Sequence, residues 1–213
     1  PYQLPEVCPS CGERVTRVEG EAATRCTNPQ CPAQLLRNLI HFASRDAMDI
    51  DGLGPALLEN LVNAGWVHSP ADLYELKEEE VAKLDRMGKK SAANLMASLE
   101  RSKQNDLSRV IFALGIPEVG EKMAALLAQQ FGTMEKLSWA TLEELTAIDG
   151  FGEVVAQNIV SFFLEERNRR QIERLARAGI NMESKKVKAG DTFAGMTFVL
   201  TGTLSQLTRE EAT

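Results

Sequence analysis

The sequence predicts a mainly α protein with a small four-cysteine knuckle and short β-hairpin first, tandem helical hairpin repeats next, and the start of an α/β unit last. Two observations support this. All four cysteines of the 213-residue chain lie in its first 31 residues. Beyond them, a glycine turn followed by an apolar helical pattern recurs four times. We therefore expect the knuckle at 1–31, four repeats at 32–183, a linker at 184–192 and the truncated α/β start at 193–213.

The cysteines follow the spacing C-x2-C-x14-C-x4-C, at Cys8, Cys11, Cys26 and Cys31. Two close pairs, each on a short turn, can place four thiolates at the corners of a tetrahedron around Zn²⁺. The stretch between the pairs alternates as a short β-hairpin does. Two disulfides, or four unrelated buried cysteines, are the alternatives. Because the given sequence shows no signal-peptide pattern and no other cysteine, we expect a zinc site. Four thiolates leave no open position for catalysis, so its role is structural.

Each repeat reads as a helix, a tight turn and a second helix. The second helices begin after glycines spaced 34, 32 and 32 residues apart, which are Gly54, Gly88, Gly120 and Gly152. Apolar residues stand four and seven positions after each glycine, which places them on one face of a helix. Before the fourth turn, Thr141 and Glu144 have the spacing of a capping box.

The turn has its fullest form, apolar-x-Gly-apolar-Gly, at 50–54 (IDGLG) and 148–152 (IDGFG). A variant, GIPEVG, lies at 115–120, and LDRMG at 84–88 keeps only the last glycine. One glycine can take a positive φ, and the other lets a ligand approach the backbone. Helix N-terminal amides can then hold a phosphate without basic side chains, which suits a net charge of -6. The alternative is a structural solenoid, but the characteristic Trp, Tyr and Pro positions of tetratricopeptide repeats are absent.

Glycines and basic residues on or next to the turns are therefore the candidate phosphate contacts. Arg86 stands where the full pattern has its first glycine, so the second turn relies more on charge than on its amides. For the basic residues, the alternative interpretation is a solvated helix face. The candidates are Gly52, Gly54, Arg86, Gly88, Lys89, Lys90, Gly115, Gly120, Lys122, Gly150 and Gly152.

These motifs, in this order, resemble the C-terminal half of bacterial NAD-dependent DNA ligases over nearly the whole chain. CPSCG and CTNPQC resemble the zinc module of that family. AMDIDGLG, RMGKKSAANL, ALGIPEVGE and IDGFGEVVA resemble its four helix–hairpin–helix repeats. The final stretch, FAGMTFVLTGTLSQLTREEA, resembles the start of a BRCT domain.

The resemblance implies an enzyme that seals nicks in double-stranded DNA, using NAD, a lysyl-AMP intermediate and Mg²⁺. The Lys-x-Asp-Gly motif of the family does not occur in this chain. The resemblance therefore implies adenylation and OB-fold domains upstream, no catalytic residue here and no ligation by this fragment alone.

The implied partner is nicked duplex DNA, gripped independently of sequence. The implied location is the bacterial cytoplasm at the nucleoid, with no membrane contact and no oligomer. The alternatives are a helix–hairpin–helix module of another repair protein, such as a nuclease subunit, or a protein–protein scaffold.

Overall fold

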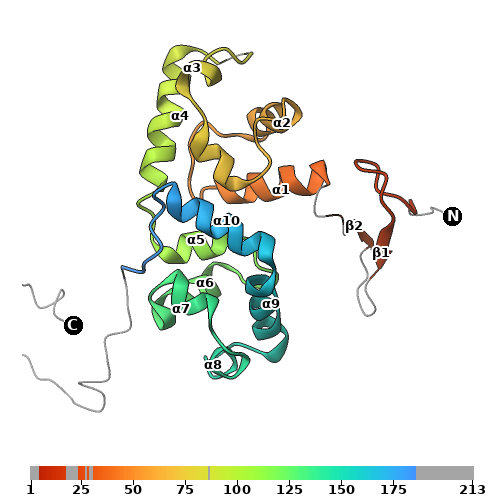
Figure 1. The fold of residues 1–213 in the computed structure, drawn as a ribbon, viewed down its shortest axis with the longest axis vertical. Coiled ribbons are helices and arrows are strands. Elements are labelled where there is room, and N and C mark those ends of the chain that lie inside the picture. Colours follow the sequence, from red (N-terminus) through yellow and green to blue (C-terminus); the bar gives the residue numbers. More distant parts are fainter. Residues whose placement is uncertain (1–4, 18–23, 27, 29–30, 86, 186–213) are drawn as a thin grey trace, which may run out of the picture.

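The computed structural model describes residues 5–17, 24–26, 28, 31–85 and 87–185, and these form a two-stranded sheet followed by a helical body (Figure 1). No described helix is long and apolar enough to span a bilayer. The helices are α1 (Pro32–Ala43), α2 (Pro55–Asn63), α3 (Glu78–Val81), α4 (Lys89–Ser102), α5 (Leu107–Ala113), α6 (Glu121–Phe131), α7 (Met134–Ser138), α8 (Leu142–Thr146), α9 (Glu153–Leu164) and α10 (Glu166–Arg177), with a 3-10 helix, η1 (Pro70–Glu75).

The predicted β-hairpin is confirmed in the knuckle. Strands β1 (Val15–Arg17) and β2 (Thr24–Cys26) are antiparallel, with Val15 opposite Cys26. A tight turn precedes β1, in which the Gly12 N–H donates to the Cys8 carbonyl at 2.9 Å and Gly12 has a φ of 73°. The turn and the register together bring the first cysteine pair next to the second.

At each of the four predicted turns the structure has two helices joined by a turn, namely α1–α2, α3–α4, α5–α6 and α8–α9. The capping box is present at the start of α8, where the Glu144 N–H donates to Thr141 Oγ1 at 3.2 Å. The residues four and seven positions after each repeat glycine are all fully buried, so the apolar face was predicted correctly. These are Leu58, Leu61, Ala92, Leu95, Ala124, Leu127, Ala156 and Ile159.

One hydrophobic core runs through the four hairpins, from Leu39 in α1 to Ile180 after α10. Because the hairpins share this core, their turns are carried by one packed body. Three described elements, η1, α7 and α10, were not predicted individually. The predicted linker, apart from its first two residues, and the BRCT-like stretch at 193–213 lie outside the described residues.

Candidate metal centre and phosphate-binding turns

The four predicted cysteine ligands converge on one point. Their Sγ atoms all lie within 4.8 Å of one another. The Cys8 and Cys31 sulfurs are 3.8 Å apart, and those of Cys11 and Cys26 are 3.5 Å apart. A tetrahedron with Zn–S bonds of ~2.3 Å has sulfur–sulfur edges of about 3.8 Å. All four thiols are free, so the two-disulfide alternative is wrong and the donor set fits zinc.

The helix that follows the knuckle favours ionisation of one ligand. Cys31 is the N-cap residue of α1 and is fully buried. The backbone N–H of Gln34 lowers the pKa of the Cys31 thiol to about 6, because a helix N-terminus stabilises a thiolate. The Gln34 side chain also donates to the Cys26 carbonyl at 3.0 Å, which ties the second strand to α1.

For Cys26, at the end of β2, the thiol pKa is raised. The backbone N–H of Asn28 lowers the pKa of the Cys26 thiol, but burial and the neighbouring thiols outweigh it and raise the pKa to about 12. Four thiolates packed this closely repel one another unless a cation offsets their charge. The cluster is therefore suited to a divalent metal, and binding would release the remaining protons.

All four hairpin turns share one backbone hydrogen bond. In each, the N–H of the apolar turn residue donates to the carbonyl three residues earlier. The distances are 3.3 Å for Leu53 to Ile50, 3.0 Å for Met87 to Leu84, 3.1 Å for Val119 to Ile116 and 3.1 Å for Phe151 to Ile148. Gly52 and Gly150, in the third position of the first and fourth turns, both have a φ of 85°, which a type II turn requires.

The third turn differs from the pattern that the sequence indicated. Gly115 has a φ of 68° and ends α5, where its N–H donates to the Phe112 carbonyl at 3.1 Å. The position equivalent to Gly52 is occupied by Glu118, with a φ of 63°. Sequence reasoning missed Glu118 because positive φ is uncommon outside glycine, asparagine and aspartate. Pro117 is the available signal, since proline favours the second position of such turns.

The last glycine of every turn is the N-cap of the next helix. Gly54, Gly88, Gly120 and Gly152 have φ between -75° and -104° and ψ between 165° and 177°. All four are exposed, and a Cβ added at any of them would meet no atom within 4 Å. A glycine offers no side-chain oxygen to the first-turn N–H groups, and no side chain caps these helices. Each turn thus presents amides beside the positive end of a helix dipole.

The four turns differ in the backbone amides and basic side chains that could contact a phosphate. At the first turn, Pro55 has no N–H and the Asp51 N–H donates to Ser98 Oγ at 2.8 Å, so fewer amides remain. The second and third turns carry Lys89, Lys90 and Lys122 in the first two helical positions, and all three are exposed. Within the described part of the chain, these lysines form no ion pair. Arg86 lies outside the described residues.

Sequence-family comparisons match three stretches of the chain. Residues 7–33 match the NAD-dependent DNA ligase C4 zinc finger domain. Residues 44–101 match the SAM-like helix-hairpin-helix tandem, and residues 109–172 match the helix-hairpin-helix motif.

Curated relatives match the whole chain. A DNA ligase of Heliobacterium modesticaldum is 53% identical over 217 residues, covering 100% of this chain and 32% of the relative. A DNA ligase of Thermoanaerobacter pseudethanolicus is 49% identical over 213 residues, covering 100% of this chain and 32% of the relative. A DNA ligase of Carboxydothermus hydrogenoformans is 51% identical over 211 residues, with 99% and 32% covered. The chain spans about a third of the length of these relatives.

Proposed function

We propose that this chain is the DNA-binding, non-catalytic portion of an enzyme that seals nicks in duplex DNA, because residues 7–33 match the NAD-dependent DNA ligase C4 zinc finger domain and two later stretches match helix-hairpin-helix families. One observation carries the proposal: four exposed glycine N-caps of matching geometry project from a single core. Such N-termini bind phosphate oxygens through N–H groups and the helix dipole.

The mode of binding follows from the chemistry of the turns. Amide–phosphate contacts position a protein on a duplex without reading bases, which suits an enzyme that must act at any nick. Lys89, Lys90 and Lys122 add contacts that weaken as salt rises, because they displace condensed counterions. The exposed carboxylate of Asp51 lies at the first turn, and its negative charge would disfavour DNA binding there. It lies 3.7 Å from the Arg101 guanidinium, which offsets this charge. Two turns of neighbouring hairpins would contact the two backbones across the minor groove.

The zinc and the catalytic chemistry have separate places in this proposal. Cys8, Cys11, Cys26 and Cys31 would hold a structural zinc that folds the knuckle. NAD and Mg²⁺ would act on adenylation and OB-fold domains elsewhere in the parent protein, in the bacterial cytoplasm, during DNA replication and repair. This chain would bind the nicked duplex and would not ligate alone.

Fluorescence anisotropy tests the DNA-binding proposal. The chain is titrated into labelled nicked duplexes of two unrelated sequences at 50 mM and 200 mM salt. We expect equal affinities for the two sequences and a steep loss of affinity at the higher salt, since several phosphate contacts are made together. No binding at 50 mM salt contradicts the proposal and favours the protein–protein scaffold.

A chimera separates the ligase from the nuclease-subunit alternative. The matching segment of the Heliobacterium relative is replaced by this chain, and sealing of a nicked duplex with NAD is measured. A chimera that seals nicks, compared with an inactive version lacking the segment, supports the ligase assignment. A folded chimera that binds the duplex but gives no sealing contradicts it.

A further inference from the structure

The last described helix, α10, contacts both halves of the repeat array. We call hairpins α1–α2 and α3–α4 (32–102) the first pair and hairpins α5–α6 and α8–α9 (107–164) the second pair. Helix α10 follows the second pair and lies across the middle of the molecule, in contact with both α9 and η1 (Figure 1). Because η1 connects the two hairpins of the first pair, α10 bridges both pairs.

Arg174 makes polar contacts from α10 to η1. Arg174 Nη2 lies 2.6 Å from Asp72 Oδ1 and 2.5 Å from Glu75 Oε1, both in η1. Its Nη1 donates to Ser69 Oγ at 3.1 Å. The Asp72 side chain is only 14% exposed, and it also accepts a hydrogen bond of 2.7 Å from the His68 backbone N–H. A guanidinium that engages several oxygens in this way fixes both distance and direction.

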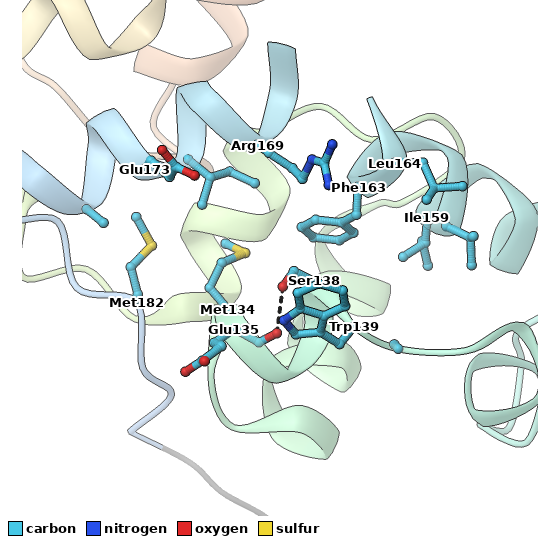
Figure 2. A pocket seen from close by; sticks show the side chains of 14 residues that line it. Met134, Glu135, Ser138, Trp139, Ile159, Phe163, Leu164, Arg169, Glu173 and Met182 are labelled. Carbon is cyan, nitrogen blue, oxygen red and sulfur yellow. Dashed lines mark hydrogen bonds between the residues drawn. The ribbon is translucent and has the colours of Figure 1, made fainter. Parts of the chain in front are cut away.

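On its other side, α10 borders an open groove next to the second pair. A hollow with a volume of about 530 Å³ lies there, between α10 and the helices α7 and α9 (Figure 2). From α10, Arg169 and Glu173 border the hollow, and Met134 and Phe163 line its opposite walls. The fully buried Leu175 anchors α10 in the core by packing. The Arg174 contacts add a directional restraint to this packing.

The segment after α10 continues the bridge. The Asn181 N–H donates to the Lys103 carbonyl at 2.8 Å, and its side chain donates to the Asn105 carbonyl at 3.0 Å. Asn105 in turn donates to the Met48 carbonyl of the first pair at 2.8 Å. On the side of the second pair, the Met134 N–H donates to the Met182 carbonyl at 2.9 Å. The bridge thus reaches both pairs at several points.

We propose that Arg174 is a positioning residue that, through Asp72 and Glu75, holds the two hairpin pairs in one register so that all four turns meet the same duplex. This inference rests on the proposed function, since it concerns the same turns. Arg174 acts through the carboxylates of η1 and has no contact with DNA in this role. Its loss leaves each pair able to bind alone and weakens the simultaneous contact of both, while the shared core still joins them.

The substitution Asp72→Asn gives the most discriminating test, because a positioning role and a simple charge effect predict opposite changes in DNA affinity. Removing a negative charge strengthens DNA binding if only net charge matters. Positioning predicts about tenfold weaker binding to a nicked duplex of about 30 base pairs. It predicts a change of less than about twofold for a stem of about 8 base pairs, which at 3.4 Å per pair spans only about 27 Å. The slope of log affinity against log salt for the long duplex should fall, since fewer phosphates are engaged together.

Matched variants on the same helix supply the controls. Arg174→Met should weaken long-duplex binding as Asp72→Asn does. Arg174→Lys should weaken it less, because lysine keeps the positive charge. Arg170→Met removes the same charge from α10, but Arg170 pairs with Glu166 on its own helix and should leave the salt slope within about one contact of wild type. Circular dichroism confirms that each variant is folded at the assay temperature. If Asp72→Asn unfolds, Glu75→Gln, at a side chain that is 65% exposed, replaces it with the same expectations.

Three outcomes overturn the inference. Equal or tighter long-duplex binding by folded Asp72→Asn overturns it, as does equal behaviour of Arg174→Met and Arg170→Met. Equal weakening on long and short duplexes also overturns it, because a merely structural role would produce that. Failure of the wild-type chain to bind either duplex is different, since it refutes the proposed function itself.

Discussion

The substitution Gly120→Ala separates phosphate binding from fold stability at a single position. Gly120 is the exposed N-cap of α6, with a φ of -82°, a backbone conformation that alanine also adopts. A Cβ at this position meets no atom within 4 Å, so the fold has room for the methyl group. The methyl group instead occupies the open side of the turn, where a phosphate would reach the amides of Gly120 and the first turn of α6.

The expected magnitudes differ for the two properties. Exchanging glycine for alanine at an N-cap should cost no more than about 1 kcal/mol of folding free energy. A hydrogen bond to a charged group contributes about 1.5–3 kcal/mol, and each 1.4 kcal/mol corresponds to a factor of ten in affinity. If one amide–phosphate contact is blocked, DNA affinity should therefore fall about ten- to hundredfold while the melting temperature changes by only a few degrees.

The other end of the same helix provides the matched control. Gly132 follows α6 and has a φ of 75°, which strains any residue with a Cβ. Gly132→Ala should lose about 1–2 kcal/mol of stability or more and keep its DNA affinity at temperatures where it stays folded. Anisotropy with a nicked duplex and thermal unfolding measure both properties for both variants. A folded Gly120→Ala variant with affinity within twofold of wild type would refute the reasoning for this turn.

Four further outcomes are expected. Cys26→Ser should abolish tight zinc binding and unfold the knuckle, measured by metal analysis and circular dichroism; a metal-free but folded knuckle would contradict this. Gly150→Ala, at a φ of 85°, should cost about 1–2 kcal/mol in chemical denaturation, and an unchanged midpoint would count against the turn geometry. Lys90→Ala should lower the salt slope of DNA binding by about one, with no change if the lysine only faces solvent. Burial raises the pKa of Asp72, but the His68 amide and Arg174 lower it more. The ionised Asp72 should therefore stabilise the fold above about pH 4, and this contribution should be lost as pH falls below that value. Equal acid sensitivity of Asp72→Asn and wild type in denaturation curves would contradict this.

Local and periodic features could be predicted from the sequence. The cysteine spacing predicted a cluster whose sulfurs lie within 4.8 Å of one another, because each pair is confined to a short turn. The spacing of the repeat glycines predicted the buried face of α2, α4, α6 and α9, since a helix repeats its face every three to four residues. The capping box at Thr141 is equally local.

Features that depend on distant residues could not be predicted. Arg174 pairs with Asp72, 102 residues earlier, and nothing in the pattern of either segment indicates the other. Glu118 adopts a positive φ that its residue type disfavours, because the surrounding helices α5 and α6 impose the turn. Helix α10 was not predicted individually, and its buried Leu175 and the contacts of Arg174 with η1 depend on packing against distant segments.

Backbone amide chemical shifts during titration with a nicked duplex test the central claim most directly. The amides of Gly54, Gly88, Gly120 and Gly152 should shift together and saturate at one duplex per chain. Gly65 and Gly179, which have positive φ and do not precede a hairpin helix, should stay unchanged. Saturable binding that leaves the four N-cap glycines unshifted would contradict the account, because the duplex would then be held by another surface.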